Sequence, residues 1–163
     1  MNQIGGRPSP LDDGRQSAAA RDICRGACRV LALHGLRAIP EVALPNGRRA
    51  DLAAIDEKGE ISIVEIKSSL ADFRADQKWP DYREFSDRLY FAVAPDFPLE
   101  LLPDEVGIIV ADRYGGEMVR PAPEHPLPGA RRRAFLLRFA RIAAGRLMTL
   151  ADPEQAFEPL PRE

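Results

Sequence analysis

The sequence predicts a single α/β domain in which a mixed β-sheet is flanked by helices. The chain has 163 residues, the size of one domain with short tails, and about 45% of them are hydrophobic, which suffices for a core. Helical periodicity near both ends encloses several short strand-like segments. Two of these, 89–94 and 106–111, are continuously apolar, as strands buried on both faces usually are. A predicted helix before them favours a parallel crossover within the same sheet.

The first half of the chain predicts a helix followed by a strand meander. Residues 1–16 lack periodicity and are expected to form a flexible tail. From Ser17 onward apolar residues recur at helical spacing, and Gly35 follows as a stop. Turn signals at 45–47 and 56–59 separate three strand candidates, which are 39–44, 51–55 and 61–66.

The second half predicts a helix, two strands and a last helix. Ser69 with Asp72 three residues later is a capping pattern, and the helix it begins should run to Trp79 and stop at Pro80. A further helical turn is expected around 82–85. After the two apolar strands, a helix is expected over 130–147. The domain would then span 17–148 and be followed by a Pro-rich acidic tail, 149–163.

Composition excludes several classes of protein. The net charge of −2 means that any nucleic acid must be held by local basic patches rather than by bulk charge. No apolar run approaches the roughly 18 residues of a membrane span, and the N-terminus lacks the apolar core of a secretion signal, so a cytoplasmic protein without a membrane partner is expected. The two cysteines, Cys24 and Cys28, are too few for a four-cysteine metal site and are expected to be buried free thiols.

One strand carries an unusual polar pair at its end. Residues two apart on a strand share a face, so Glu65 and Lys67 project together. A hairpin would lay the preceding strand, with Asp51 near its start, beside them. The register decides whether Asp51 lies opposite Glu65 or Lys67, and a turn centred near 58–59 would favour Lys67. All three side chains are expected to meet at one end of the hairpin.

These residue types have a specific chemistry available. Two adjacent carboxylates bind a hard cation such as Mg²⁺ or Mn²⁺, and the Ile66 carbonyl is a further oxygen ligand. A lysine beside the cation can orient a water molecule and offset charge on a phosphate. The chain has 20 Arg and only 3 Lys, so a lysine at this position is notable. The pattern alone fits a structural ion pair at a sheet end equally well.

The order of these motifs resembles a known group of nucleases. Asp51, then Glu65-Ile66-Lys67 after a hairpin, then a helix, resembles the PD-(D/E)XK nuclease superfamily. The strings GRRADLAAIDEKGEISIVEIKSS, ADFRADQKWPDY and DRLYFAVAP resemble more closely the MmcB family, a bacterial DNA-repair-associated branch, over about 17–148. The resemblance implies a restriction-endonuclease-like fold and metal-dependent hydrolysis of phosphodiester bonds in damaged or structured DNA. Asp51 and Glu65 would bind Mg²⁺ or Mn²⁺, and Lys67 would serve the hydrolytic water.

The sequence departs from the superfamily pattern at a few positions. Ala50 replaces the eponymous proline. The further acid that many members carry on the first helix has two candidates here, Asp22 on that helix and Glu41 on the first strand. Gln77, Lys78 and Tyr82, after the motif, match the residues often found there only loosely. The spacing of Asp76 and Lys78 is interpreted as the end of a helix.

Arginines supply the candidate DNA contacts. Arg48 and Arg49 immediately precede Asp51 and suit phosphate contacts beside a metal site. In the last helix Arg131, Arg138 and Arg141 fall on one face, and no acid occurs between Gly129 and Met148. These residues form a basic stripe that would track a phosphate backbone.

Two other readings stay open at the level of sequence. One is a non-catalytic DNA-binding or adaptor module that keeps the nuclease-like fold. The other is a protein-interaction subunit that works with a repair-protein partner. Salt-dependent DNA binding is expected of the nuclease and of the adaptor but not of the interaction subunit.

Overall fold

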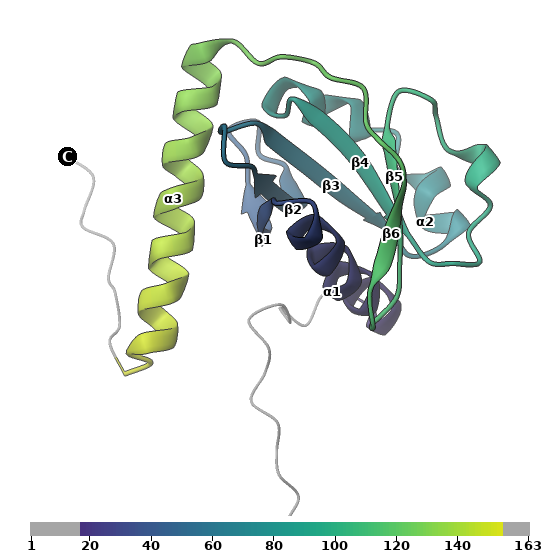
Figure 1. Cartoon of the computed structure of the whole chain (residues 1–163), viewed down its shortest axis with the longest axis horizontal. Helices are drawn as coiled ribbons and strands as arrows, with labels where there is room; N and C mark the ends of the chain where they lie inside the picture. The colour runs from purple at the N-terminus through teal and green to yellow at the C-terminus, as the bar shows by residue number, and fades with distance from the viewer. Residues whose placement is uncertain (1–16, 155–163) are drawn as a thin grey trace, which may run out of the picture.

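The computed structural model describes residues 17–154, and within them a six-stranded mixed sheet is flanked by helices (Figure 1). This confirms the predicted α/β fold class. In chain order the elements are α1 (Ala18–Leu33), β1 (Arg37–Ala43), β2 (Arg49–Ile55), β3 (Ile61–Lys67), α2 (Leu70–Ala75), the 3-10 helix η1 (Trp79–Phe85), β4 (Arg88–Val93), the 3-10 helix η2 (Leu99–Leu101), β5 (Gly107–Ala111), β6 (Gly116–Arg120) and α3 (Gly129–Ala151). None of the helices in this range combines the length and the apolar character that a bilayer span requires. The predicted tail 1–16 lies outside the described residues, as does most of the tail 149–163.

The strands lie side by side in the order in which they occur along the chain. β1, β2 and β3 form an antiparallel meander, β3, β4 and β5 are parallel, and β6 returns antiparallel to β5. The helical connection from β3 to β4 is the predicted crossover. β6 was not predicted, because only Met118 and Val119 in it are apolar and most of its residues are exposed.

Two apolar layers cover the sheet. On one face α1 packs Ile23, Ala27 and Leu31 against Leu52 and Val64. The other face carries Ile63, Phe91, Tyr82 of η1, and Phe135 and Phe139 of α3. Because neighbouring residues of a strand alternate between faces, Glu65 and Lys67 lie on the same face as Ile63, toward η1.

Two helices start where predicted, each with a serine cap of which only that at Ser69 was predicted, and two helix ends differ. The Ser17 hydroxyl accepts the Ala20 amide hydrogen at 3.1 Å, and the Ser69 hydroxyl accepts that of Asp72 at 3.1 Å. α2 ends at Ala75 rather than at Trp79, and α3 continues to Ala151 rather than stopping at Leu147. The predicted turn of helix near 82–85 belongs to η1, whose first turn contains Pro80.

A buried carboxylate joins three parts of the domain. Asp87, at the start of β4, is 1% exposed. Its oxygens accept the amide hydrogens of Ile61 and Leu127, each at 2.8 Å. They also accept hydrogen bonds from two guanidinium nitrogens of Arg132, at 2.7 and 2.8 Å. This acid therefore fastens the start of α3 and the segment before it to the sheet.

The two edge strands of the sheet, β1 and β6, are covered to different extents. α3 lies along β1, where Arg138 donates to the Ala43 carbonyl at 3.1 Å and Arg146 donates to the carbonyls of Pro40 and Glu41. β6 forms the opposite edge, and α1 covers only one face of the β5–β6 hairpin. Gly26 makes this approach possible, because a Cβ atom there would lie 2.1 Å from the Asp112 carbonyl oxygen.

Candidate active site

Asp51 and Glu65 meet where the β2–β3 ladder ends. The backbone pairing runs from Ile55–Ile61 as far as Leu52–Val64. Beyond that point, side chains rather than backbone groups accept the hydrogen bonds between the two strands. An Asp51 carboxylate oxygen accepts the Ile66 amide hydrogen at 2.7 Å, and a Glu65 carboxylate oxygen accepts the Asp51 amide hydrogen at 3.3 Å. One oxygen of each carboxylate is thereby fixed by the backbone of the other strand.

The register settles the alternative left open by the sequence. Extending the pairing by one residue from Leu52–Val64 sets Asp51 level with Glu65 and not with Lys67. The turn closes with the Asp56 amide donating to the Glu60 carbonyl, so it is centred on Lys58 rather than between 58 and 59. Lys67 lies one step further along the same face of β3.

Lys67 is buried, at 4% exposure, and has a carboxylate partner of its own. Its ammonium nitrogen lies 2.5 Å from a carboxylate oxygen of Asp76, just after α2, and 5.5 Å from the centre of the Phe91 ring. The other Asp76 oxygen accepts the Lys78 amide hydrogen at 2.9 Å. Burial alone would raise the pKa of Asp76, but the hydrogen bonds from Lys67 and Lys78 and the charges of Lys67 and Arg48 outweigh it and lower this pKa.

The other two carboxylates have raised pKa values. Burial is the main cause for Asp51, whose pKa rises to about 6 although the Ile66 hydrogen bond and the Lys67 charge oppose the shift. Burial, and then the charge of Asp51, raise the pKa of Glu65 well above its ordinary value. The protein thus holds two adjacent acids whose negative charge its own groups do not fully compensate.

Tyr82 of η1 closes the site on the side of Glu65. Its hydroxyl donates to the Arg49 carbonyl at 3.1 Å. Burial, together with the charges of Glu65 and Asp51, raises the pKa of this phenol, so it stays protonated. The sequence indicated this residue only loosely. It did not indicate Asp76, since the acid-to-lysine spacing before Lys78 was interpreted as a helix end.

A third acid lies level with the pair. The pairs Pro40–Leu52 and Val42–Ala50 flank Glu41, which places it beside Asp51 on β1. Glu41 has a φ of 52°, in the left-handed region, and its carboxylate forms an ion pair with Arg49. Asp22, the other candidate, is exposed on α1.

Cys24 of α1 lies near Asp51 and Glu41. The hydrogen bond with Cys28 and burial are the main causes that raise the pKa of the Cys24 thiol, and the charges of Asp51 and Glu41 contribute to the same shift.

The donor set fits magnesium-type binding. Within residues 17–154 no group of three or more His, Cys, Asp or Glu side chains has the arrangement to hold a metal ion. Two carboxylates, a backbone carbonyl and several water or phosphate oxygens are what Mg²⁺ ordinarily uses. Asp51, Glu65 and the Ile66 carbonyl supply that set. The half-buried Cys28 and the buried Cys24, both free, supply no thiolate to it.

Other predicted site residues lie at the margin. Gln77 and Lys78 are exposed, and the Gln77 amide donates to the Arg74 carbonyl at 3.0 Å. Arg48 pairs with Asp81, with its closest nitrogen at 2.6 Å. These contacts hold the segment after α2 against the start of β2, next to Asp51.

The predicted basic stripe lies along the edge strand β1. Arg131 donates to the Glu84 carbonyl at 3.4 Å, and Arg138 bonds to β1 as described above. Arg141 is exposed. Arg138 therefore helps to fasten α3 to β1, whereas Arg131 contacts η1.

A mixed sheet with an acid on one strand, a Glu-Xaa-Lys triplet at the end of the next and a helix after it defines a protein with the restriction-endonuclease-like fold. The chain belongs to the MmcB-like family: the family model described as "DNA repair protein MmcB-like" matches residues 7–154. The chain is also similar to a solved structure described as "SPO1766 protein of unknown function from Silicibacter pomeroyi". That match has 44% sequence identity and a TM-score of 0.83, and it covers 88% of this chain and 99% of the other. Among curated proteins no match was found.

Proposed function

We propose that this DNA repair family member is a metal-dependent deoxyribonuclease that hydrolyses phosphodiester bonds in damaged or structured DNA. The observation that carries the proposal is the adjacent pair of the half-buried Asp51 and the buried Glu65, each bonded to a backbone amide of the other strand, beside a lysine whose charge is already shared with Asp76. A purely structural ion pair would be expected to match one acid with one base. Here Lys67 pairs with Asp76 and its charge also acts on Asp51 and Glu65, so one base serves three acids, and a divalent cation would balance the remaining charge.

Each residue has a role in this proposal. Asp51 and Glu65, with the Ile66 carbonyl, would hold Mg²⁺ or Mn²⁺. The bound metal would polarise a phosphoryl oxygen and lower the pKa of water. Lys67, held by Asp76, would orient the attacking water and offset charge on the phosphate. Tyr82, through the Arg49 carbonyl, would fix the start of β2.

Arg48 and Arg49 would lie nearest to the backbone of the bound DNA, and contacts to phosphates favour recognition of structure over sequence.

The direct test is a cleavage assay with labelled single strands, duplexes, flaps and mismatched DNA, in Mn²⁺, Mg²⁺ or EDTA. Cleavage should require the metal. Asp51→Asn, Glu65→Gln and Lys67→Ala should each reduce it by about a hundredfold or more. Asp22→Asn is the matched control, since this acid is exposed on α1, and it should cleave like the unaltered protein.

The Lys67–Asp76 pair favours one competing function, a DNA-binding adaptor without catalysis, because it partly neutralises the lysine. An adaptor would bind DNA in a salt-dependent manner in EDTA and cleave nothing in any metal. Metal-independent cutting, or equal cutting by Asp51→Asn, would contradict the proposed nuclease site. Unfolding midpoints of all variants show whether a lost activity reflects a lost fold.

A further inference from the structure

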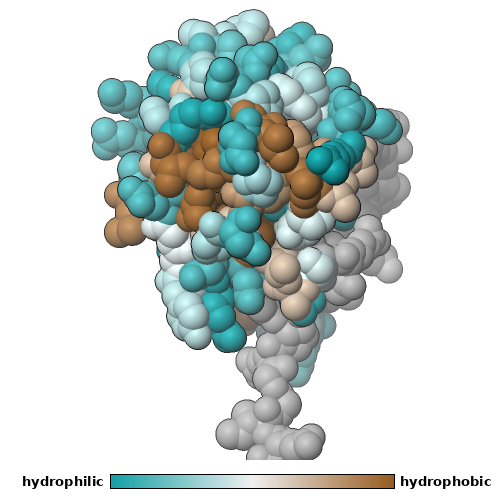
Figure 2. All heavy atoms as spheres, turned by 90° about the vertical axis from the view of Figure 1, so that its right-hand side faces the viewer, coloured by the Kyte–Doolittle hydropathy of each residue, from teal (hydrophilic) through white to brown (hydrophobic). Residues whose placement is uncertain are grey.

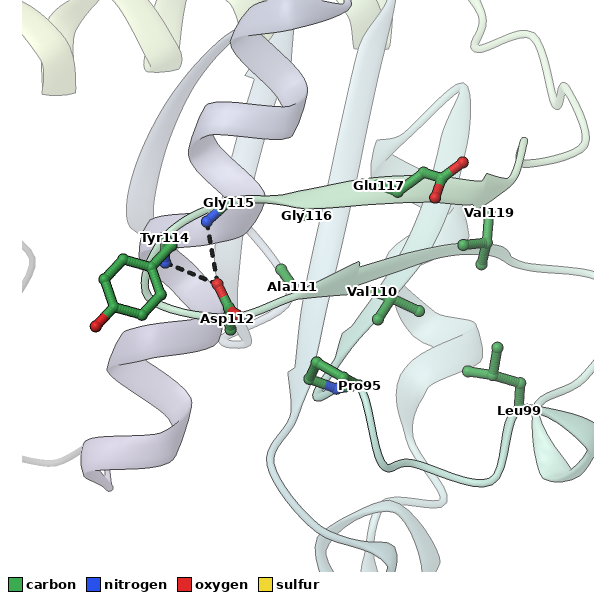
Figure 3. Close-up of a pocket in the computed structure, with 10 residues that line it drawn as sticks. All are labelled: Pro95, Leu99, Val110, Ala111, Asp112, Tyr114, Gly115, Gly116, Glu117 and Val119. Atoms are coloured by element: carbon green, nitrogen blue, oxygen red, sulfur yellow. Dashed lines mark hydrogen bonds between the residues drawn. The ribbon is translucent and has the colours of Figure 1, made fainter.

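The β5–β6 hairpin is covered on one face only. α1 packs on one side through Gly26. On the other side, a groove of about 650 Å³ runs between the hairpin and the segment that follows β4 (Figure 3). Its apolar lining comes from Pro95, Leu99, Val110 and Val119. This groove lies two strands away from the Asp51–Glu65 pair, because β4 and β5 follow β3 in the sheet.

Apolar side chains continue beyond the groove. Figure 2 shows them gathered in a band across the face of the molecule that carries the hairpin. Leu101 of η2 is 44% exposed and Val119 of β6 is 43% exposed. Contiguous apolar surface of this kind, rimmed by polar residues, is typical of a site that another molecule covers.

β6 also presents backbone hydrogen-bonding groups. The Asp112 amide donates to the Gly115 carbonyl at 2.9 Å, which fixes the antiparallel alternation along the hairpin. In that alternation the N–H and C=O groups of Gly116 and Met118 point away from β5. At the opposite edge, the carbonyls of β1 receive Arg138 and Arg146 from α3. Such an edge is where an extended segment adds to a sheet.

The charges around the groove indicate which kind of segment would bind there. The two charged residues that line it, Asp112 and Glu117, are both acidic, and Glu100 is exposed on η2. A phosphate backbone would be repelled there. A second copy of this chain, paired edge to edge, would bring Glu117 of one copy close to the acidic rim of the other. Basic side chains are favoured instead.

We propose that the β6 edge and this groove form a docking site for an extended segment of a partner protein in which an apolar and a basic residue lie two positions apart. The segment would add as a seventh strand next to β6. Because residues two apart on a strand share a face, an apolar side chain would enter the groove beside Val119 and a basic one two positions away would face Glu117. This surface is independent of the proposed nuclease chemistry and uses none of its residues.

The probe, a lysine–valine peptide, is a short capped chain in which every second residue is alternately valine or lysine, with threonine between them. It is titrated into the isotope-labelled full chain and followed by NMR. Shifts should be confined to β5, β6 and the segment after β4. Hydrogen exchange of the Gly116 and Met118 amides should slow by about tenfold or more, because these amides would become bonded. The same peptide with glutamate in place of lysine should bind at least about fivefold more weakly, and a fully N-methylated lysine–valine peptide should not bind.

Two variants complete the test. Glu117→Lys should weaken the lysine–valine peptide by at least about fivefold. Glu57→Lys, an exposed acid in the β2–β3 turn, should not change its binding. Equal binding of the glutamate and lysine peptides, unchanged exchange of the β6 amides, or dimers of the chain that pair through β6 would overturn the proposal. None of these readouts involves DNA or metal, so their failure is distinct from failure of the proposed nuclease.

Discussion

Two groups of acids in this domain, Asp87 alone and the Asp51–Glu65 pair, differ in how their charge is balanced. Asp87 accepts two backbone amide hydrogens and a two-pronged contact from Arg132, so every direction around its carboxylate holds a donor. Asp51 and Glu65 accept one backbone amide hydrogen each, and their pKa values are raised. The first arrangement stabilises the fold. The second favours the protonated form of both acids, and perturbed pKa values of this kind occur often at functional sites.

The largest expected effect is on the stability that Asp87 provides. Asp87→Ala leaves two buried amide hydrogens and Arg132 without their acceptor, and it should reduce the free energy of unfolding by about 3–5 kcal/mol. Chemical denaturation measures this. Asp104→Ala is the matched control, because Asp104 also pairs with an arginine, Arg120, but is fully exposed, and its midpoint should hardly change. Similar losses for both variants would break the distinction between the two groups of acids.

Asp51 should have a smaller effect on the free energy of unfolding, and one of opposite sign, because its ionised carboxylate destabilises the folded state. Its pKa is raised from 3.8 to about 6 in the folded protein, so the folded state binds the proton more tightly than the unfolded one. The contribution of Asp51 to stability is therefore greatest below about pH 4 and falls as the pH rises toward 6, by about 2–3 kcal/mol. Denaturation curves between pH 4 and 7 should show the unaltered protein losing stability relative to Asp51→Asn. A constant difference across that range would contradict the raised pKa.

The smallest of the three effects is stabilisation by metal. Mn²⁺ at about ten times its Kd should raise the free energy of unfolding by about 1.4 kcal/mol, because it binds the folded state only. Asp51→Asn should lose this increment. Asp87→Asn should keep it, although that variant is less stable to begin with. A thermal-shift series in EDTA and Mn²⁺ measures both, and an increment that disappears in Asp87→Asn would show that the two groups of acids are not separate.

Local patterns in the sequence were sufficient for most of the fold and for the two acids. The helix start at Ser17, the cap at Ser69, the apolar strands and the turns all depend on neighbouring residues, and they were confirmed. Because residues two apart share a face, Glu65 and Lys67 were expected together, and the hairpin brought Asp51 to them. The exact partner of Asp51 depended on a one-residue difference in the turn, which local patterns do not determine.

What the sequence did not show depends on contacts between distant residues. α2 ends early because Asp76 leaves the helix to meet Lys67, and no local stop signal precedes Pro80. The arginines of α3 were expected to hold phosphate, yet Arg138 bonds to a β1 carbonyl, a contact invisible in a helical periodicity. β6 was missed since an exposed edge strand needs little apolar character.

Gly26 has a consequence for comparing members of this family. The nearest atoms to a Cβ there belong to the backbone carbonyls of Asp112 and Gly115, at 2.1 and 2.5 Å, so no rotamer change makes room for a larger residue. Position 26 is therefore a diagnostic marker in an aligned set of relatives. A relative with any other residue there must carry its hairpin further from the first helix, and the geometry of its outer strand should not be inferred from that of this chain.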